Sequence, residues 1–262
     1  MSGIIWPTQD EMWVSATNDQ MYYARLVDQV DRSVDLIRNV SDQNRFDVEY
    51  LEHDLIPALG LNNETLSEQP PELSQYFGTG LHLWQYPNQL AKYLVWLAKN
   101  ATGIRTFLEI GCRWGGTFIL VNEWLKRIGA PIESSVAIDP IPATPFVTRY
   151  MEISSTPIYY KECFSTNPEF ATFCDGYRPD MVFIDGDHRM AGVMNDHLLF
   201  RSSAKIIVHH DISSDSCPDT SLFWKYVSHA EDCFTARAFT DQYPSVRGSF
   251  LGIGALLRTE PT

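Results

Sequence analysis

The chain has 262 residues, of which 33 are acidic and 20 basic, so its formal net charge is −13. This balance argues against a general affinity for nucleic-acid backbones or anionic membranes, because no run of lysine and arginine exists to displace counterions. No apolar stretch approaches the ~20 residues of a membrane-spanning helix, and the start of the chain lacks a signal-peptide pattern. Five scattered cysteines without a CxxC pair are typical of thiols in a reducing compartment. We therefore expect a cytoplasmic globular protein.

The first 77 residues have a helical pattern. Between residues 19 and 40, apolar side chains recur at spacings of four, four and three, which indicates an amphipathic helix; they are Leu26, Val30, Val34 and Ile37. A second helix is expected over residues 45–59, followed by a polar loop that contains Pro70 and Pro71. We predict that residues 1–77 form a helical appendage. It could serve as a lid, as a cap on one sheet edge, or as a dimerisation element that makes a homo-oligomer.

From residue 78 to residue 262 the pattern alternates between strands and helices. Short apolar runs without polar alternation predict strands that are buried on both faces of a parallel sheet, at residues 105–110, 135–138, 158–160, 181–184 and 205–208. Helices are expected at residues 88–99, 117–128, 145–153, 168–174, 189–200 and 221–229. Two further strands, 234–239 and 250–257, end the chain as a hairpin. The expected fold is α/β, a doubly wound, mostly parallel seven-stranded sheet with one late antiparallel strand.

Ligands of doubly wound sheets bind at the carboxyl ends of the strands, so the residues at those ends are the candidates for function. The first strand ends in Glu109 and a turn with Gly111 and Gly115, where a tight backbone leaves room for a ligand. The second ends at Asp139, a carboxylate placed to accept both hydroxyls of a ribose. Together these residues predict a nucleoside site, with capping of the following segment as the alternative role of Asp139.

A second group of polar residues follows the fourth and fifth strands. They are Asp185, Asp187 and His188 after the fourth strand, and His209, His210 and Asp211 at the end of the fifth. Neighbouring parallel strands would bring the two groups within a few ångströms of each other. Crowded carboxylates and imidazoles repel or desolvate one another unless a cation or substrate organises them, which predicts a metal site with a nearby base. The structural alternative is that Asp187 caps the next helix and His209 packs in the core.

In this order, the motifs resemble those of class I S-adenosylmethionine-dependent methyltransferases. The segment EIGCRWGG is similar to the family's first motif, which holds the methionine part of the cofactor, and Asp139 matches the acidic residue that binds the ribose. The segments FIDGDH and VHHD resemble a narrower group, the metal-dependent O-methyltransferases of the macrocin and mycinamicin type with the cephalosporin-hydroxylase-like proteins. GLHLWQYPNQLAKYL is also similar to that group. The likeness covers about residues 78–257.

The resemblance implies a role for each matching residue. Those that contact the cofactor would be Glu109, Gly111, Gly115, Asp139, Phe164 and Asp185. Asp185, His210 and Asp211 would hold a divalent metal, Mg or Mn, and His210 stands where the group has an acidic ligand. An imidazole suits Mn, Fe, Co or Zn better than Mg. His188 falls at the position of the general base, with His210 as the alternative catalytic histidine.

The implied reaction is transfer of a methyl group from S-adenosylmethionine to a hydroxyl of a sugar or another small polyol-bearing molecule. Nucleic acid and membrane are not expected partners. Three alternatives stay open: a metal-independent methyltransferase of the same fold, a nicotinamide-dependent oxidoreductase, and a non-catalytic binding protein. The GxxxGG spacing argues against the oxidoreductase, because close approach of a pyrophosphate requires GxGxxG.

Overall fold

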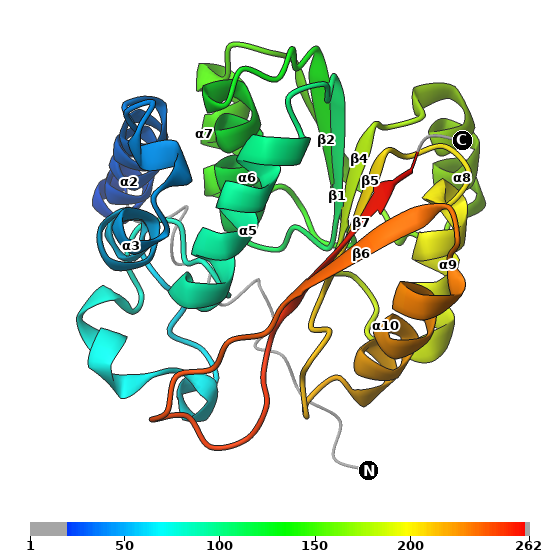
Figure 1. Ribbon diagram of the computed structural model, residues 1–262. Coiled ribbons are helices and arrows are strands. Elements are labelled where there is room, and N and C mark those ends of the chain that lie inside the picture. The colour runs from blue at the N-terminus through cyan, green and yellow to red at the C-terminus, as the bar shows by residue number, and fades with distance from the viewer. Residues whose placement is uncertain (1–19, 260–262) are drawn as a thin grey trace.

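The computed structural model describes residues 20–259, which form one seven-stranded sheet with helices on both sides (Figure 1). The strand order is β3-β2-β1-β4-β5-β7-β6. The strands are β1 (Thr106–Ile110), β2 (Ser134–Asp139), β3 (Ile158–Glu162), β4 (Met181–Ile184), β5 (Ile206–His210), β6 (Phe234–Phe239) and β7 (Ile253–Arg258). The first five pair in parallel, and β7 is antiparallel to both β5 and β6. The predicted doubly wound sheet is confirmed.

The last strand begins three residues later than its apolar pattern predicts. Leu251 and Gly252 have φ values of +62° and +99°. A left-handed backbone cannot continue a ladder, so the strand begins at Ile253.

Two layers of helices cover the sheet. One face packs against α5 (Pro87–Asn100), α6 (Gly116–Arg127) and α7 (Pro145–Ile153), and the other against α8 (Pro168–Tyr177), α9 (Met190–Phe200) and α10 (Pro218–Ala230). Side chains alternate between these layers along each strand. Phe107 and Phe183 belong to the core on the α5 side, whereas Leu108 and Val182 belong to the core on the α8 side. None of the described helices is long and apolar enough to cross a membrane.

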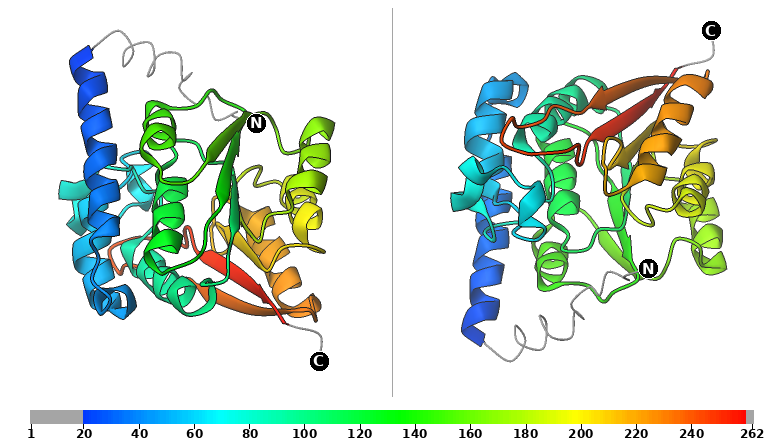
Figure 2. Two further views of the ribbon diagram at one scale, coloured as in Figure 1. Left: turned by 90° about the horizontal axis from the view of Figure 1, so that it is seen from above. Right: turned by 90° about the horizontal axis from the view of Figure 1, so that it is seen from below.

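The N-terminal residues pack on the α5–α7 layer. Helix α2 (Gln20–Arg38) confirms the first predicted helix, whose residue 19 lies outside the described part of the chain, and it runs along α6 and α7 (Figure 2). Its apolar stripe is buried in one core with α5 and α6. This core is where most of the stability of an amphipathic helix originates.

The second predicted helix is present but interrupted. It consists of a 3₁₀ turn (Asn44–Phe46), α3 (Val48–Tyr50), a π-helical turn (Leu51–Leu55) and α4 (Ile56–Leu59). Pro57 has no N–H to donate to residue 53, and the Ile56 N–H donates to the Leu51 carbonyl instead, which widens the helix just before the proline. Two 3₁₀ turns, Leu66–Glu68 and Pro71–Tyr76, follow in the predicted polar loop.

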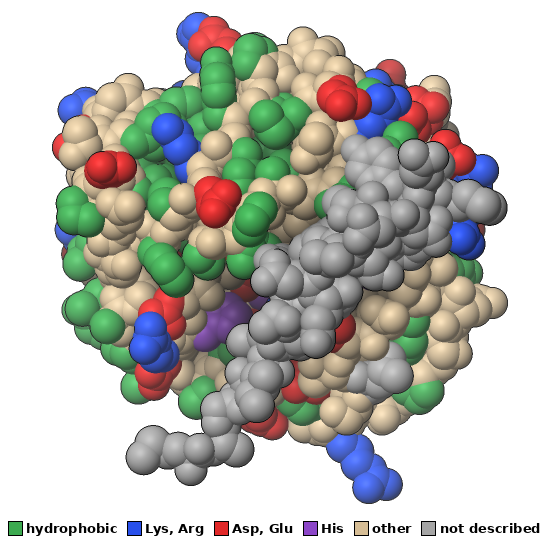
Figure 3. Space-filling view, turned by 180° about the vertical axis from the view of Figure 1, so that it is seen from behind, with side chains coloured by type: hydrophobic (Ala, Val, Ile, Leu, Met, Phe, Trp, Pro, Cys, Tyr) green, Lys and Arg blue, Asp and Glu red, His purple; other side chains and the backbone are tan. Residues whose placement is uncertain are grey.

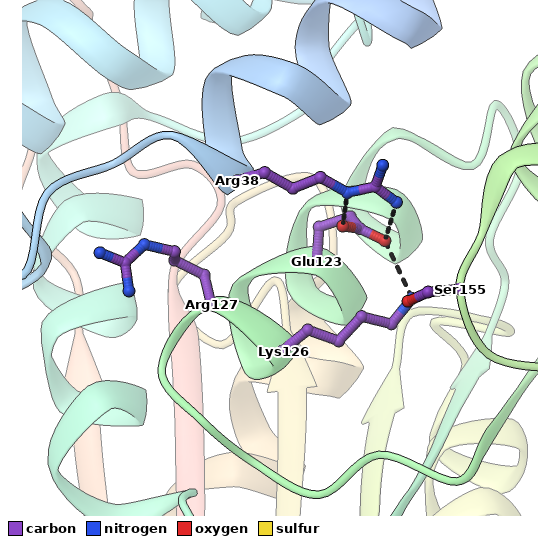
Figure 4. Close-up of a pocket in the computed structure, with 5 residues that line it drawn as sticks. All are labelled: Arg38, Glu123, Lys126, Arg127 and Ser155. Carbon is purple, nitrogen blue, oxygen red and sulfur yellow. Dashed lines mark hydrogen bonds and ion pairs between the residues drawn. The ribbon is translucent and has the colours of Figure 1, made fainter.

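A buried carboxylate holds the end of α2 on α6. Glu123 is 1% exposed and accepts hydrogen bonds from Arg38 Nε at 2.7 Å and Lys126 Nζ at 2.9 Å (Figure 4). It also accepts the Tyr150 hydroxyl at 2.6 Å. Burial opposes the charge of Glu123, but these donors hold its pKa below the usual value. Arg127 lines the same pocket but points away, toward the Val40 carbonyl and Asp42. The cations of this pocket are therefore committed to structural partners.

The packing of α2 gives a direct test with adjacent residues. Ile37→Ala removes a fully buried side chain and should lower the free energy of unfolding by about 2–5 kcal/mol, as measured by denaturant titration. Leu36→Ala, at a position that is 42% exposed, should change it by less than about 0.5 kcal/mol. Equal small effects of the two substitutions would contradict the docking of α2.

Candidate functional site at the carboxyl edge of the sheet

The candidate residues meet where β1 and β4 lie side by side. On one side of this pair the chain winds toward β3 and on the other toward β6, so this is the point where ligands of doubly wound sheets bind. Gly111 follows β1 with a φ of +81°, and a Cβ at this position would lie 2.0 Å from the Asp185 carbonyl oxygen. The Asp185 N–H donates to the Ile110 carbonyl at 2.9 Å. Only glycine permits this close approach of the two strand ends.

Asp139 organises the glycine turn. Its Oδ2 accepts the Arg113 N–H at 2.8 Å, and its Oδ1 accepts the Ile141 N–H at 3.2 Å. Burial raises the pKa of Asp139, and these two backbone donors oppose that rise. Gly115 has a φ of +87° and precedes α6, where an added Cβ would lie 2.4 Å from a methyl group of Val147. Asp139 therefore has a capping function here, and its predicted contact with a ribose stays a prediction.

Two other predicted cofactor residues differ sharply in exposure. Glu109 is 1% exposed, and its Oε2 has no hydrogen-bond partner among the described residues. Burial raises the pKa of Glu109 well above its usual value. Phe164, which follows β3, is 67% exposed. Glu109 is therefore enclosed beneath the strand ends, whereas the side chain of Phe164 is open to solvent and available to a ligand.

Four predicted residues form one cluster. Asp185 Oδ1 lies 3.0 Å from His210 Nδ1 and 3.1 Å from His188 Nε2. Asp211 lies 3.6 Å from both imidazoles, through Oδ1 to His210 Nδ1 and through Oδ2 to His188 Nε2. Figure 3 shows histidine surface inside a depression on the face opposite to that of Figure 1. The acidic and imidazole groups of β4 and β5 thus meet as predicted.

Two neighbours in sequence lie outside this cluster. Asp187 pairs with Arg189 at 2.6 Å and accepts its backbone N–H just before α9. His209 points to the opposite layer, where its Nε2 lies 3.1 Å from His197 Nδ1. Alternation along β5 explains why adjacent histidines have different surroundings. His209 is therefore packed in the core, as its structural alternative predicts. Asp187 binds the residue before α9 but does not cap the helix, because the first helical N–H, of Met190, donates to Asp219.

The cluster has the electrostatic features of a cation site. His210 Nε2 donates to Gln85 Oε1 at 2.5 Å, so Nδ1 faces the two carboxylates. His210 Nδ1 and Asp211 Oδ1 are buried, and neither makes a hydrogen bond of good geometry. With protein groups alone, burial opposes charge on both imidazoles, but the carboxylates raise the pKa of His188 to about 11 and that of His210 well above its usual value. A divalent ion could replace these protons, and the donors fit one.

Sequence reasoning missed three residues of the site. Gln85 orients His210, and its Nε2 donates to Gln89 Oε1. Cys217 Sγ lies 3.2 Å from both His188 Nδ1 and Asp211 Oδ2. Glu64 accepts Arg113 Nη2 at 2.6 Å and Trp114 Nε1 at 3.3 Å. Gln85 belongs to the segment that carries the family resemblance, but no spacing signal connects Cys217 or Glu64 to the cluster.

The polar segment after α4 runs along the same edge. Glu64 contacts the residues of the glycine turn, and Glu68 Oε1 accepts the Ser216 hydroxyl at 2.8 Å in the loop after β5. Residues 64–68 therefore connect the nucleoside side of the edge with its acid–histidine side. This placement favours a cap or lid among the roles considered for the N-terminal residues.

No protein-family model matches the chain, and no curated protein matches it. Similar solved structures include the O-methyltransferase TomG from Streptomyces achromogenes, involved in tomaymycin synthesis and determined with SAM, which is 16% identical over 84% of this chain and 100% of its own, with a TM-score of 0.49. Cofactor-bound Rv0187 from MTB is 21% identical over 66% of this chain and 81% of its own, with a TM-score of 0.48. MycE methyltransferase of the mycinamycin pathway, determined with Mg, SAH and mycinamycin VI, is 14% identical over 65% of this chain and 51% of its own, with a TM-score of 0.43.

The seven-stranded mixed sheet is consistent with the class I methyltransferase fold. At these identities and scores, the neighbours assign neither a ligand nor an activity to this chain.

The glycine approach makes a specific prediction. Gly111→Ala should place a methyl group against the Asp185 carbonyl and lower the free energy of unfolding by more than about 1 kcal/mol, measured by denaturant titration. Gly176→Ala is the matched control, because Gly176 lies in α8 with no atom within 4 Å of the added Cβ. That substitution should be neutral or stabilising by up to about 1 kcal/mol. Indistinguishable stabilities of the two variants would show that the strand ends are not in close contact.

Proposed function

We propose that the protein is a class I S-adenosylmethionine-dependent O-methyltransferase that uses a divalent metal. The observation that carries this proposal is the meeting, at one edge of the sheet, of a glycine turn, an acidic residue after β2 and an acid–histidine cluster. The first two suit a nucleoside cofactor, and the third suits metal-assisted deprotonation of a hydroxyl. The resemblance of EIGCRWGG, FIDGDH and VHHD to this family points to the same activity.

The cofactor would lie between the β1 turn and the end of β3. Gly111 and Gly115 keep the turn free of side chains, Asp139 would accept the ribose hydroxyls, and exposed Phe164 would contact adenine. Glu109, which is buried in β1, and Asp185, which follows the adjacent strand β4, would also contact the cofactor. A carboxylate-rich edge also suits the positive charge of a sulfonium group.

Asp185, His210 and Asp211 would hold the metal. Bound there, a divalent ion would orient neighbouring substrate oxygens and lower the pKa of the reacting hydroxyl. Gln85 would act by positioning: its oxygen takes the Nε2 proton of His210 and leaves Nδ1 as the donor atom. Because one of the three donors is an imidazole, this set suits Mn better than Mg, which prefers oxygen ligands.

His188 would accept the proton of the acceptor hydroxyl. Its Nε2 faces Asp185 and Asp211, and only its neutral form can act as a base. Because the two carboxylates raise the pKa of His188 to about 11, it becomes a competent base near neutral pH only when their charge is offset. In the transfer, the sulfur–methyl bond breaks as the oxygen–methyl bond forms, and the hydroxyl proton moves to His188. The acceptor class, a sugar or other small polyol, comes from the resemblance.

The proposal also includes roles for the N-terminal residues and a location for the protein. Residues 64–68 would cap the edge as part of the N-terminal appendage, residues 1–77, of the domain at 78–262. The homo-oligomer expected through the N-terminal helices stays a prediction. The described cysteines are all free thiols, which suits the expected cytoplasmic location.

Cofactor binding is tested by thermal unfolding. S-adenosylmethionine or S-adenosylhomocysteine at 100 times its dissociation constant should stabilise the protein by about 2.7 kcal/mol, whereas NAD should have no effect. Asp139→Asn should reduce the shift, because an amide has only one accepting oxygen for the two ribose hydroxyls. That oxygen can still accept the Arg113 N–H, whereas the Ile141 N–H loses its acceptor, so the stability of the unliganded variant is measured as well. A shift with NAD alone would replace the proposal by an oxidoreductase. A shift with none of these ligands would overturn it.

The role of His188 is tested by substitution and pH. His188→Ala should lower kcat by about 10²–10⁴-fold while S-adenosylmethionine still binds, and wild-type kcat should rise with pH because the base must be neutral. The variant should lose this rise. Asp187→Asn is the control, since Asp187 pairs with Arg189 outside the cluster. Unchanged turnover in His188→Ala would transfer the role to His210.

A further inference from the structure

A second set of metal-binding donors lies beside the first and shares Asp211 with it. His188, Asp211 and Cys217 each offer one donor atom within 4.8 Å of the other two, as do Asp185, His210 and Asp211. The two sets use different oxygens of Asp211: Oδ1 faces His210, whereas Oδ2 lies 3.2 Å from Cys217 Sγ. Asp211 can therefore contribute to both.

Cys217 is held in place by the fold. It is the last residue before α10, is 9% exposed, and has its Sγ 3.2 Å from His188 Nδ1. Burial raises the pKa of the Cys217 thiol and its contact with His188 opposes that rise, so a metal ion would bind the sulfur by displacing the thiol proton. In residues 20–259, no other cysteine belongs to such a donor set.

The donor atoms of this second set differ in kind from those of the first. A thiolate sulfur, an imidazole nitrogen and a carboxylate oxygen make a three-ligand set that suits zinc, which takes a fourth ligand from solvent or substrate. Magnesium prefers oxygen ligands and retains water, so it gains little from a sulfur donor. The chemistry of the set therefore selects a thiophilic divalent ion.

We propose that His188, Asp211 and Cys217 form a binding site for Zn²⁺ or a similar thiophilic ion, distinct from the Asp185–His210–Asp211 set. An imidazole bound to zinc through Nδ1 carries its proton on Nε2, where it cannot accept another. Zinc at this site should therefore inhibit methyl transfer by occupying His188. Only this inhibition rests on the proposed function, because zinc binding itself does not require it.

The test measures metal binding directly. Zn²⁺ and Mg²⁺ are titrated by calorimetry into chelator-treated protein, and Co²⁺ is titrated with absorption spectroscopy, in wild type, Cys217→Ser, Cys217→Ala and the control Cys233→Ser. We expect Cys217→Ser to weaken Zn²⁺ binding by at least about 10-fold and to remove the thiolate-to-cobalt charge-transfer band. Cys233→Ser should retain both, and Mg²⁺ affinity should be equal in all four proteins. Thermal unfolding verifies that each variant is folded. If Cys217→Ser does not fold, Cys217→Ala is used in its place.

The results that would overturn the zinc site differ from those that would overturn the proposed methyltransferase activity. Equal Zn²⁺ affinity in wild type and Cys217→Ser, or cobalt binding without a thiolate band, would overturn the assignment of Cys217. A parallel loss of Mg²⁺ and Zn²⁺ affinity in Cys217→Ser would overturn the existence of two distinct sets. Neither result affects the binding of S-adenosylmethionine, whose absence alone would refute the methyltransferase.

Discussion

Asp185 and Asp211 place two carboxylates at the ends of adjacent strands, where they require compensating positive charge. The neighbouring side chains are arranged to provide that charge. Removing such groups from water is costly unless a partner of opposite charge lies close. His210 and His188 supply that partner with protein atoms alone, and a metal ion could supply it instead. The negative charge of this site can be balanced either by protonated imidazoles or by a metal ion. Such a site is suited to exchange protons for cations, which is the chemistry we propose for it.

The N-terminal residues and the doubly wound domain depend on each other. The apolar stripe of α2 and the residues of α4 share a core with α5 and α6, so the two parts do not have separate interiors. Glu64 and Glu68 extend from this packed region across the carboxyl edge. A segment that is anchored in the core in this way can define the shape of the edge without itself supplying a reacting group.

The order of elements could be read from the sequence because buried parallel strands and amphipathic helices leave different periodicities. The meeting of Asp185, His210 and Asp211 followed from the same argument, since strand ends align along one edge. Other features carried no such signal. The π-helical turn before Pro57 and the start of β7 only after Leu251 and Gly252 leave the apolar pattern unbroken, and the contact of Cys217 with His188 joins residues distant in sequence.

A main-chain carbonyl far from the cluster determines which nitrogen of His210 is free. The Asp241 carbonyl can only accept, so Gln89 presents its amide nitrogen there, at 2.8 Å, and turns its oxygen toward the Gly252 N–H and Gln85 Nε2. Gln85 must then offer its own oxygen to His210 Nε2, which fixes the proton on that nitrogen. The connection between β6 and β7 thus sets the tautomer of a histidine in β5, and a change in that hairpin could switch the donor atom without altering any residue of the cluster.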